Sequence, residues 1–448
     1  MSKSFRLGLL LIGLLLFAVT AVFPQVVSER KELAVFRLSY YRWDIPNAVL
    51  GGIDEEIRSV FINLGRFDVV GLTQRLEEGD VNEFIDKIKQ YKEQQVEIPE
   101  EVQMGQAFFT RADFDRLVGS FIVVMPSVAN YVVTRLGAKN YQANIKTSFT
   151  FINVEEGRTF AQAFVDTEGK EETAELAIKE ALDKIPMQLT YEVRKIPEFQ
   201  IKTGILEVRG SEVILELGRD LGLKVGDEFV IVSSRILETG KTLSQENGLL
   251  VIKEVSDEVS VGKVIYARPQ PQIGDQLQEI PRLGLDTSPY VHYAVGLAYD
   301  RNGTVIIGAR QSFSRGFYSF RPLVGIEVPF VANIAAGLPL NIYVGGEYDI
   351  YFGRFQIVPT AAFGVGGAYL WYLRNRSDED KFIMTYVGGN AGIMVNYLFH
   401  KNFRFSLEVG YLNWFSLVPV KDVYIFKGKF LFPDYDGAYL GAGLTIKY

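Results

Sequence analysis

The chain has 448 residues and carries 47 Lys and Arg against 54 Asp and Glu, which gives a formal net charge of −7 at pH 7. Its hydrophobic share of 48% and charged share of 23% are those of a globular protein and exclude a disordered tail, a collagen and a multi-span helical transporter. The sequence contains no cysteine and only two histidines, His292 and His400, so disulfides, thiolate metal sites and cysteine nucleophiles are excluded. The lack of a basic block argues against a nucleic-acid partner.

The composition changes near residue 285. Residues 288–448 hold 33 aromatic residues and 20 of the 42 glycines and have a net charge of +3, whereas the rest of the chain carries −10. The length alone suggests about three domains, at roughly 150 residues per domain. We therefore expect exported or soluble modules first and a chemically different domain at the end.

Residues 1–21 have the layout of a secretory signal peptide. Lys3 and Arg6 precede an apolar run of 17 residues from Leu7 to Phe23, and Val19-Thr20-Ala21 supplies small residues for cleavage. The alternative is an uncleaved helical anchor, because 17 residues reach the lower limit of a membrane span. No cysteine follows the run, so a lipoprotein anchor is not expected.

Residues 31–197 show strand and helix patterns in alternation. Apolar runs predict strands at 33–38, 67–72, 121–125, 143–152 and 159–166, and helical spacing predicts helices at 48–64, 79–95 and 170–195. The expected fold is an α/β sandwich. The LGGID segment before Glu55 lacks the Lys-Ser/Thr of a phosphate-binding loop, so we expect its glycines to serve helix packing.

This order of elements resembles the periplasmic sandwich of the curli-secretion protein G and penicillin-binding-protein-activator group, and is similar to the amino-terminal domain of TolB. The resemblance is carried by the strand 33–38, the helix 48–64, GRFDVV at 65–70 and TSFTFINVEEGRTFAQAFV at 147–165. It implies a domain without catalytic residues that binds a protein or an envelope polymer.

Residues 198–282 read as short strands separated by glycine turns, which is typical of an all-β module. The segments GILEVRGSEVILELGRDLGLKVGDEFVIV at 204–232 and GLLVIKEVSDEVSVGKVIYARPQPQIGDQLQEI at 248–280 resemble the carboxy-terminal module of flagellar assembly protein T. The resemblance implies a small barrel in which GLKVGD forms a tight turn, with Gly226 at a positive φ. The module could serve as a docking surface or as a rigid spacer, and the sequence leaves both open.

Residues 288–448 alternate apolar and polar or small side chains over long segments. We expect eight strands, at about 290–299, 303–313, 318–329, 340–352, 354–372, 383–398, 402–415 and 437–448. About ten residues suit a tilted membrane strand. Aromatic residues near strand ends, Tyr290 with Tyr299, Phe352 with Phe355, and Tyr369 with Trp371 and Tyr372, indicate the girdles of outer-membrane barrels. The sequence predicts an eight-stranded antiparallel transmembrane β-barrel.

The connections of this barrel indicate its orientation. The turns Ser314–Phe317, Gly353 and His400-Lys401 are short, and the loops Val331–Pro339, Leu373–Phe382 and Ser416–Asp436 are long. Short inner turns and long outer loops are the rule for outer-membrane barrels, so the amino-terminal modules should lie in the periplasm. The ending Gly443, Leu444, Ile446 and Tyr448 resembles the terminal signal recognised by the barrel-assembly machinery.

Six charged residues fall on the inward parity of the predicted strands: Arg310, Arg321, Glu327, Glu347, Arg404 and Glu408. Because eight strands leave room only for side chains, a salt-bridged interior is expected ahead of an ion path. His292 and His400 are expected near the periplasmic end, away from the outer rim where barrel enzymes place their histidines. No catalytic, cofactor or metal residue is therefore assigned, and the acidic run Ser377–Asp380 is expected to be a solvated loop.

The sequence favours a non-enzymatic outer-membrane protein whose two-module periplasmic arm binds an envelope, secretion or flagellar component. Expected partners are outer-membrane lipid, the barrel-assembly machinery, and a periplasmic protein or peptidoglycan-associated partner. One alternative is a barrel that itself acts as a surface adhesin or small pore, with the arm as a spacer. A second is a soluble periplasmic protein with a β-sandwich tail.

Overall fold

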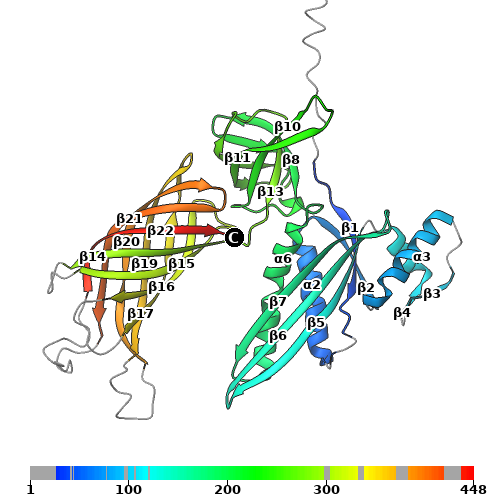
Figure 1. Ribbon diagram of the computed structural model, residues 1–448, viewed down its shortest axis with the longest axis horizontal. Coiled ribbons are helices and arrows are strands. Elements are labelled where there is room, and N and C mark those ends of the chain that lie inside the picture. Colours follow the sequence, from blue (N-terminus) through cyan, green and yellow to red (C-terminus); the bar gives the residue numbers. More distant parts are fainter. Residues whose placement is uncertain are drawn as a thin grey trace, which may run out of the picture.

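The computed structural model describes residues 27–40, 43, 45–76, 78–94, 99–104, 107–119, 122–296, 303–330, 338–369, 382–417 and 435–448. It contains an open five-stranded sheet, a closed six-stranded barrel and a closed eight-stranded barrel, in that order along the chain (Figure 1). The expected multidomain fold with an antiparallel eight-stranded barrel at its end is confirmed. The signal-peptide prediction falls on residues outside the described ones.

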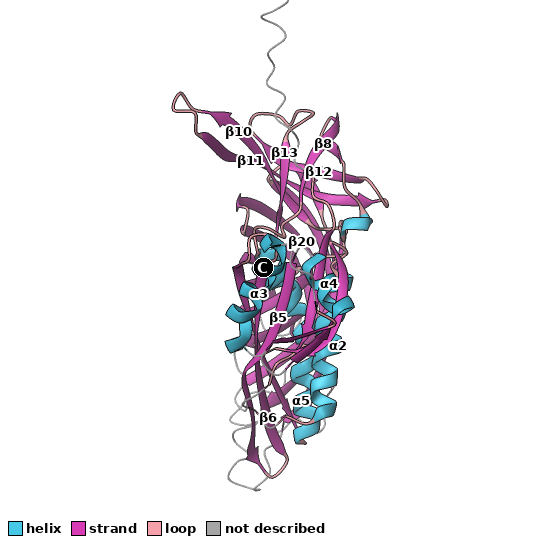
Figure 2. Ribbon diagram, turned by 90° about the vertical axis from the view of Figure 1, so that its right-hand side faces the viewer, coloured by secondary structure: helices cyan, strands magenta, loops and turns pink. Residues whose placement is uncertain are grey.

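The first module is built on a sheet with the strand order β2-β1-β5-β6-β7. Its strands are β1 (Lys31–Arg37), β2 (Phe67–Arg75), β5 (Ile122–Gly137), β6 (Asn140–Asn153) and β7 (Arg158–Glu171). One face is covered by the helices α2 (Asn47–Asn63), α5 (Ala174–Asp183) and α6 (Ile185–Lys195), whose apolar residues share one core with the sheet (Figure 2). The other face is covered only in part, by α3 (Val81–Gln94), α4 (Arg111–Gly119) and the hairpin β3 (Glu101–Met104) and β4 (Ala107–Thr110).

Two elements of this module differ from the sequence prediction. The expected helix 170–195 is two helices. The first starts later than expected, because β7 stays paired with β6 as far as Glu171. The second starts where Pro186 occupies the first turn of α6, a position that suits proline. Thr173 caps α5 with its side chain, which accepts a hydrogen bond from Leu176 N at 3.3 Å. The strand expected at 121–125 extends to Gly137, so β5, β6 and β7 form a long three-stranded arm of the sheet.

The second module is a closed barrel with the strand order β10-β11-β12-β9-β8-β13. The strands are β8 (Lys202–Arg209), β9 (Glu212–Leu215), β10 (Glu228–Ile236), β11 (Thr242–Val255), β12 (Ser260–Ala267) and β13 (Gln276–Ile280). A short helical turn, η2 (Arg219–Leu221), leads into the GLKVGD turn, where Gly226 has the expected positive φ, at 85°. Phe229, Leu250 and Leu277 are among the residues that fill its centre.

The third module closes on itself. Its strands are β14 (Leu285–Gly296), β15 (Gly303–Phe313), β16 (Phe320–Phe330), β17 (Leu338–Tyr348), β18 (Ile350–Phe352), β19 (Phe355–Tyr369), β20 (Phe382–His400), β21 (Phe403–Ser416) and β22 (Tyr435–Lys447). β18 continues β17 beyond Asp349, so eight strand positions surround the lumen. β14 pairs with β22, and β17 pairs with β19, so every neighbour in the ring is hydrogen-bonded.

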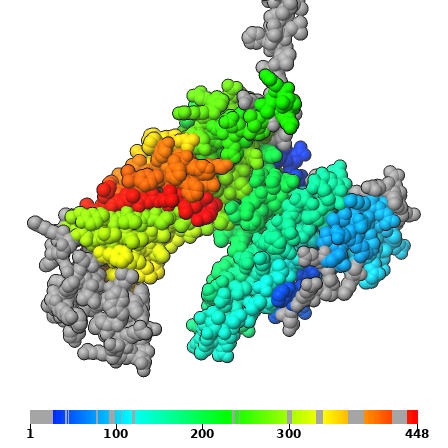
Figure 3. Space-filling view, in the orientation of Figure 1, coloured from blue at the N-terminus to red at the C-terminus, as the bar shows by residue number. Residues whose placement is uncertain are grey.

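The second module lies between the other two and touches both through glycines at the ends of its GLKVGD turn (Figure 3). Gly222, at φ 76°, lies against the backbone of Leu64 and Gly65, and a Cβ there would overlap the Leu64 carbonyl oxygen. Gly226 lies against the turn between β15 and β16, and a Cβ there would overlap the carbonyl oxygen of Ser314. The turn therefore makes one close backbone contact with each neighbouring module, at positions where only glycine has room.

We expect Gly222→Ala to destabilise the contact between the first two modules. Gly210 is a matched control, because its φ of 64° is also positive but nothing lies within 4 Å of its would-be Cβ. Gly210→Ala should cost only the left-handed strain of about 1 kcal/mol. Gly222→Ala should cost clearly more, measured by thermal unfolding and by protease cleavage between residues 196 and 204. Equal losses for the two variants would contradict the close contact.

Candidate functional site

The interior of the eight-stranded barrel holds all six charged residues predicted to point inward, each at most 6% exposed. Three of them belong to a cluster towards the middle of the lumen. Arg310 Nη2 donates to Glu408 Oε2 at 2.6 Å, and the Tyr439 hydroxyl donates to the other oxygen of Glu408 at 2.7 Å. Glu327 accepts from Tyr290 and Asn341 at 3.0 and 3.1 Å.

The other three lie in a second cluster near the end of the barrel that carries the short turns. Arg321 is 3.1 Å from Asp286 and 2.8 Å from Asp349, with Glu347 at 4.0 Å. Arg404 donates to Asp286 at 2.6 Å. Each buried arginine therefore has a carboxylate within ion-pair distance.

Several interior residues were not identified from the sequence. Asp286 was missed because β14 begins at Leu285, five residues earlier than expected, and pairs with β15 from there. For the same reason His292 lies mid-strand, stacked between the rings of Tyr290 and Tyr439 at 4.3 and 4.4 Å, instead of at the end of the barrel. The girdle prediction for Tyr290 is wrong: its parity is inward and it is 4% exposed. Alternation counted from residue 285 would have found all three.

The outside of the barrel is apolar around its middle. Aliphatic side chains with between 39% and 63% of their surface exposed are Val291, Val295, Val305, Ile307, Ile326, Ile342, Val344, Val365, Val387, Ile393, Val395, Leu407, Val409 and Leu440. Exposed aromatic residues towards the short-turn end are Phe313, Phe320, Tyr348, Phe352, Phe355, Tyr397, Phe399 and Tyr448. A polar interior, an apolar exterior and an aromatic belt are the features of an outer-membrane barrel.

The four residues of the expected assembly signal lie on the strand that closes the ring. Leu444, Ile446 and Tyr448 have outward parity, and Gly443 points to the interior beside Ser406. Tyr448 N donates to Leu285 O, and Gly284 N donates to Tyr448 O, both at 3.2 Å. The last residue is thus paired with the start of β14.

We expect Arg310→Met to destabilise the barrel by about 3–5 kcal/mol, because it leaves Glu408 buried without its arginine. The double variant R310M/E408L, which removes both charges, should regain most of that loss. Unfolding in denaturant of the protein in lipid vesicles measures both. A double variant no more stable than the single one would show that the two charges are not coupled.

A buried ion network joins the three modules. Glu279 of the small barrel accepts from Arg66 at 2.9 Å and from Arg194 at 2.7 Å, and both arginines come from the first module. Arg194, which is 0% exposed, also donates to Asp227 at 2.9 Å. Asp227 in turn accepts from Arg315, in the turn after β15, at 3.0 Å. One pair of carboxylates therefore holds arginines from both neighbouring modules.

A second part of the network ties the small barrel to the closing strand of the large one. Arg282 donates to Glu228 at 3.0 Å and to Lys447 O at 3.0 Å. Lys447 forms an ion pair with Glu228, and Asn402 accepts from Arg282 at 2.9 Å. Burial opposes ionisation of Glu228, but the charges of Lys447 and Arg282 outweigh it and lower its pKa to about 2. Likewise burial opposes ionisation of Glu279, yet Arg66 and Arg194 hold its pKa below the usual range.

Apolar contacts extend this junction. The outer face of the small barrel packs around Leu398 at the end of β20, which is 2% exposed. Tyr318 and Tyr351 of the large barrel pack against the same cluster, and the guanidinium of Arg354 lies 3.5 Å from the ring centre of Tyr266. The small barrel therefore covers part of the short-turn mouth of the large one.

The junction residues could not be found from the sequence. Arg66, Arg194, Asp227, Glu228, Glu279 and Arg282 form this set, and they look like ordinary surface charges in their own segments. Arg194 directly follows Val193, which is buried in the core of the first module, whereas Arg194 is buried against carboxylates of the neighbouring module. An ion pair between two modules produces no periodic pattern in the sequence of either module.

The pKa shifts at the junction predict a loss of stability in acid. A carboxylate whose folded-state pKa is depressed contributes stability above its ordinary pKa, near 4.5, and that contribution disappears as the pH falls towards its folded-state value, about 2 for Glu228. We expect the melting temperature of the detergent-solubilised protein to fall steeply between pH 4.5 and 2.5. Glu228→Gln should flatten this slope, and Glu238→Gln, an exposed control, should not. If the melting temperature falls with the same slope in the unmodified protein and in both variants, the assignment of the acid sensitivity to Glu228 is contradicted.

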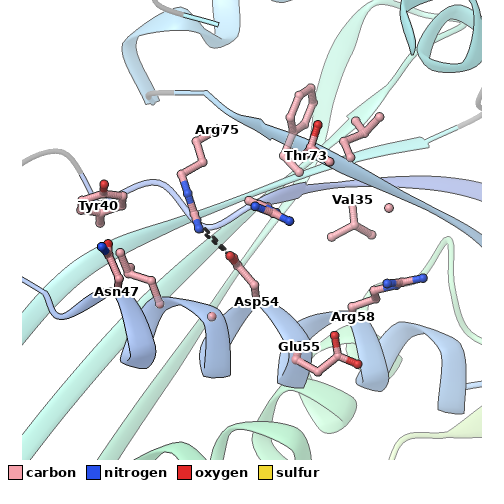
Figure 4. Close-up of a pocket in the computed structure, with 14 residues that line it drawn as sticks. Val35, Tyr40, Asn47, Asp54, Glu55, Arg58, Thr73 and Arg75 are labelled. Carbon is pink, nitrogen blue, oxygen red and sulfur yellow. Dashed lines mark hydrogen bonds and ion pairs between the residues drawn. The ribbon is translucent and has the colours of Figure 1, made fainter. Parts of the chain in front are cut away.

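The first module carries a cleft between α2 and the strands β1 and β2, with a volume of about 480 Å³ (Figure 4). Arg75 spans it and donates to Asp54 Oδ2 at 2.6 Å. Asp54 also accepts from Leu38 N at 2.7 Å, which fixes the helix to the end of β1. Gly52 of the LGGID segment packs against Leu182 of α5, as expected for helix packing, whereas Gly51 opens onto the cleft.

Among the described residues, no cluster of three histidine and carboxylate side chains could hold a metal ion. No helix within the described part of the chain is long and apolar enough to cross a bilayer. His400 is the last residue of β20, next to the short turn before β21, and His292 lies among the interior tyrosines.

No protein-family model and no curated protein matches the sequence. Among solved structures, Neisserial surface protein A is 12% identical, with 37% of this chain and 96% of that chain covered and a TM-score of 0.26. The amino-terminal β-barrel domain of OprF from Pseudomonas aeruginosa is 10% identical, with 36% and 96% covered and a TM-score of 0.24. The PelC dodecamer from Paraburkholderia phytofirmans is 14% identical, with 37% and 92% covered and a TM-score of 0.22. At these values the similarities carry no argument about function.

Proposed function

We propose that this chain is a non-enzymatic outer-membrane protein whose barrel anchors a rigid periplasmic arm of two modules, and that the arm binds a cell-envelope partner. The observation that carries the proposal is the buried ion network at the junction, because it holds both arm modules in one arrangement at the mouth of the barrel. Such a connection would fix the position of a binding module relative to the membrane.

The exterior and interior of the barrel support the anchoring role. In lipid, each unpaired backbone group costs several kcal/mol, so a β-sheet can reside there only as a closed ring of strands with an apolar exterior. This barrel has both features. The short turns and the attached arm share one end of the barrel, which supports an orientation with that end in the periplasm.

The same interior weighs against the alternative of a pore. Paired charges and tyrosine rings occupy the lumen, and the small barrel packs on its short-turn mouth. Eight strands leave room for little else. An adhesin role would depend on the outer loops 331–337, 370–381 and 418–434, which lie outside the described residues.

The surface of the arm offers a place for a partner. The face of β5, β6 and β7 opposite the helices carries cross-strand rows such as Val132–Asn144–Glu168, and Ser148 with Phe164. Val132 and Phe164 are 41% and 49% exposed. A broad, mostly polar sheet face with few apolar anchors suits a protein or peptide partner. The resemblance of the arm to curli-secretion, TolB and flagellar assembly modules supports the same class of partner.

The first test concerns the membrane. We expect the protein to remain in the outer-membrane fraction through an alkaline wash and to be released by detergent. Leu407→Arg should lower the stability of the membrane-embedded form by about 2–4 kcal/mol. Leu136→Arg is a matched control, because Leu136 is exposed to the same extent, 53% against 52% for Leu407, but lies on the arm. Release without detergent, or equal effects of the two variants, would contradict the anchor.

The second test concerns the arm. A photo-crosslinking residue at Phe164, on the open sheet face, should capture one envelope component in intact cells. The same residue at Leu176, which is 48% exposed on α5, is the control and should not capture that component. Steady conductance of the purified protein in planar bilayers, or loss of cell-surface binding on deleting 416–436 with no crosslink at Phe164, would favour the pore or adhesin instead.

A further inference from the structure

The cleft between α2 and β1–β2 is open because two lining positions are glycine. Gly51 of α2 has nothing within 4 Å of its would-be Cβ, and Gly71 of β2 meets only the side chain of Arg58, at 3.5 Å. The volume of about 480 Å³ lies within the range of small-molecule sites. The cleft can therefore admit a small ligand without movement of the sheet or the helix.

The charges that line the cleft are only partly paired. Three arginines and two carboxylates contribute to its wall. Arg75 and Asp54 satisfy each other, and Arg75 also donates to Leu38 O at 2.5 Å, so this pair is a fixed polar bridge across the cleft. The remaining groups are Arg37, Arg58 and Glu55.

These three groups have no hydrogen bond or ion pair with any described residue. Glu55 and Arg58 are three residues apart on α2, a spacing at which opposite charges usually pair, yet no ion pair joins them (Figure 4). Arg58 lies against Gly71 of the facing strand, across the cleft from its own helix. Two guanidinium groups and one carboxylate that contribute to the lining of the cleft are thus left without a partner among the described residues.

The usual explanation for such groups is that exposed arginines are simply solvated. Here, however, the unpaired cations and the unpaired anion line one cleft. A guanidinium binds a carboxylate with two parallel hydrogen bonds. A dianion such as phosphate would meet the arginines but would be repelled by Glu55. A ligand that carries a carboxylate and a nearby ammonium would satisfy both signs.

We propose that this cleft binds the free amino and carboxyl groups of a short peptide, with Arg37 and Arg58 on the carboxylate and Glu55 on the ammonium. The inference deepens the proposed function of the arm and rests on it for the access of the cleft to envelope peptides. It adds a ligand class and a site that are separate from the open face of β5–β7.

The test uses the full-length protein in detergent micelles and calorimetric titration with four probes: dialanine, N-acetyl-dialanine, dialanine amide and inorganic phosphate. Dialanine should bind most tightly, and blocking either end should weaken binding about tenfold or more. No binding of dialanine, or phosphate binding more tightly than dialanine, would overturn the proposal.

Variants assign the roles. Arg58→Gln should weaken dialanine binding at least about tenfold, whereas Arg158→Gln, an exposed arginine of the same module, should leave it unchanged. Glu55→Gln should reduce dialanine binding to the level of N-acetyl-dialanine. Gly51→Leu fills the cleft at a helical position with free space and should abolish binding while the module stays folded. Unchanged binding in Arg58→Gln and Gly51→Leu would place the ligand elsewhere and overturn the site.

The outcome is distinguishable from that of the proposed function. If no probe binds but the residue at Phe164 still captures a partner, the peptide site fails and the anchored arm remains. If dialanine binds as expected but the protein leaves the membrane without detergent, the site stands and the anchoring role fails.

Discussion

The pairing of β14 with β22 is the contact on which the rest of the structure depends. It joins the first and last strands of the large barrel over residues 286–296 and 437–447 and turns a sheet into a ring. Without it, two rows of backbone groups would be left unpaired, which a lipid environment does not tolerate. The pairing also brings Lys447, at the end of the ring, beside Glu228 and Arg282 of the arm.

The interior and the junction follow from this closure. Once the strands form a ring of eight, the inward charged side chains are removed from solvent, and a charge there is tolerated only beside a partner. Arg310 with Glu408, and Arg321 with Asp286, satisfy this requirement. The same rule operates at the rim, where Asp227 and Glu279 take arginines from both neighbouring modules. Buried ion pairs thus stabilise both the interior of the barrel and its junction with the arm.

Much of the barrel could be predicted from sequence, because alternation with a period of two survives in every strand. The inward parity of Glu347 and Glu408 followed directly from it. The prediction is wrong where it misplaces the start of a strand. It starts the first barrel strand at residue 290, whereas β14 starts at Leu285, so it omits Asp286 and places His292 near the end of the barrel instead of mid-strand. The split of the expected helix 170–195 was missed because its apolar spacing continues across Pro186.

The junction and the cleft were beyond sequence reasoning for a different reason. Arg194 and Glu279 are 85 residues apart and belong to different modules, so no local pattern connects them. The cleft is lined by a glycine of a helix and a glycine of a strand, and either one alone indicates only packing. What the sequence did provide is the GLKVGD turn, whose Gly226 was expected at positive φ; its contact with the large barrel was visible only in the structure.

Closure of the ring can be tested directly, because the chain has no cysteine of its own. Val291 and Ala442 are directly paired between β14 and β22, and both side chains point outward. Cysteines at these two positions should form an intramolecular disulfide in the membrane-embedded protein, seen as a shift in electrophoretic mobility that a reductant reverses. Cysteines at Val291 and Val409, which are not paired, should not. Failure of the first pair to crosslink, or disulfides only between separate chains, would show that the ring is open and would contradict the account.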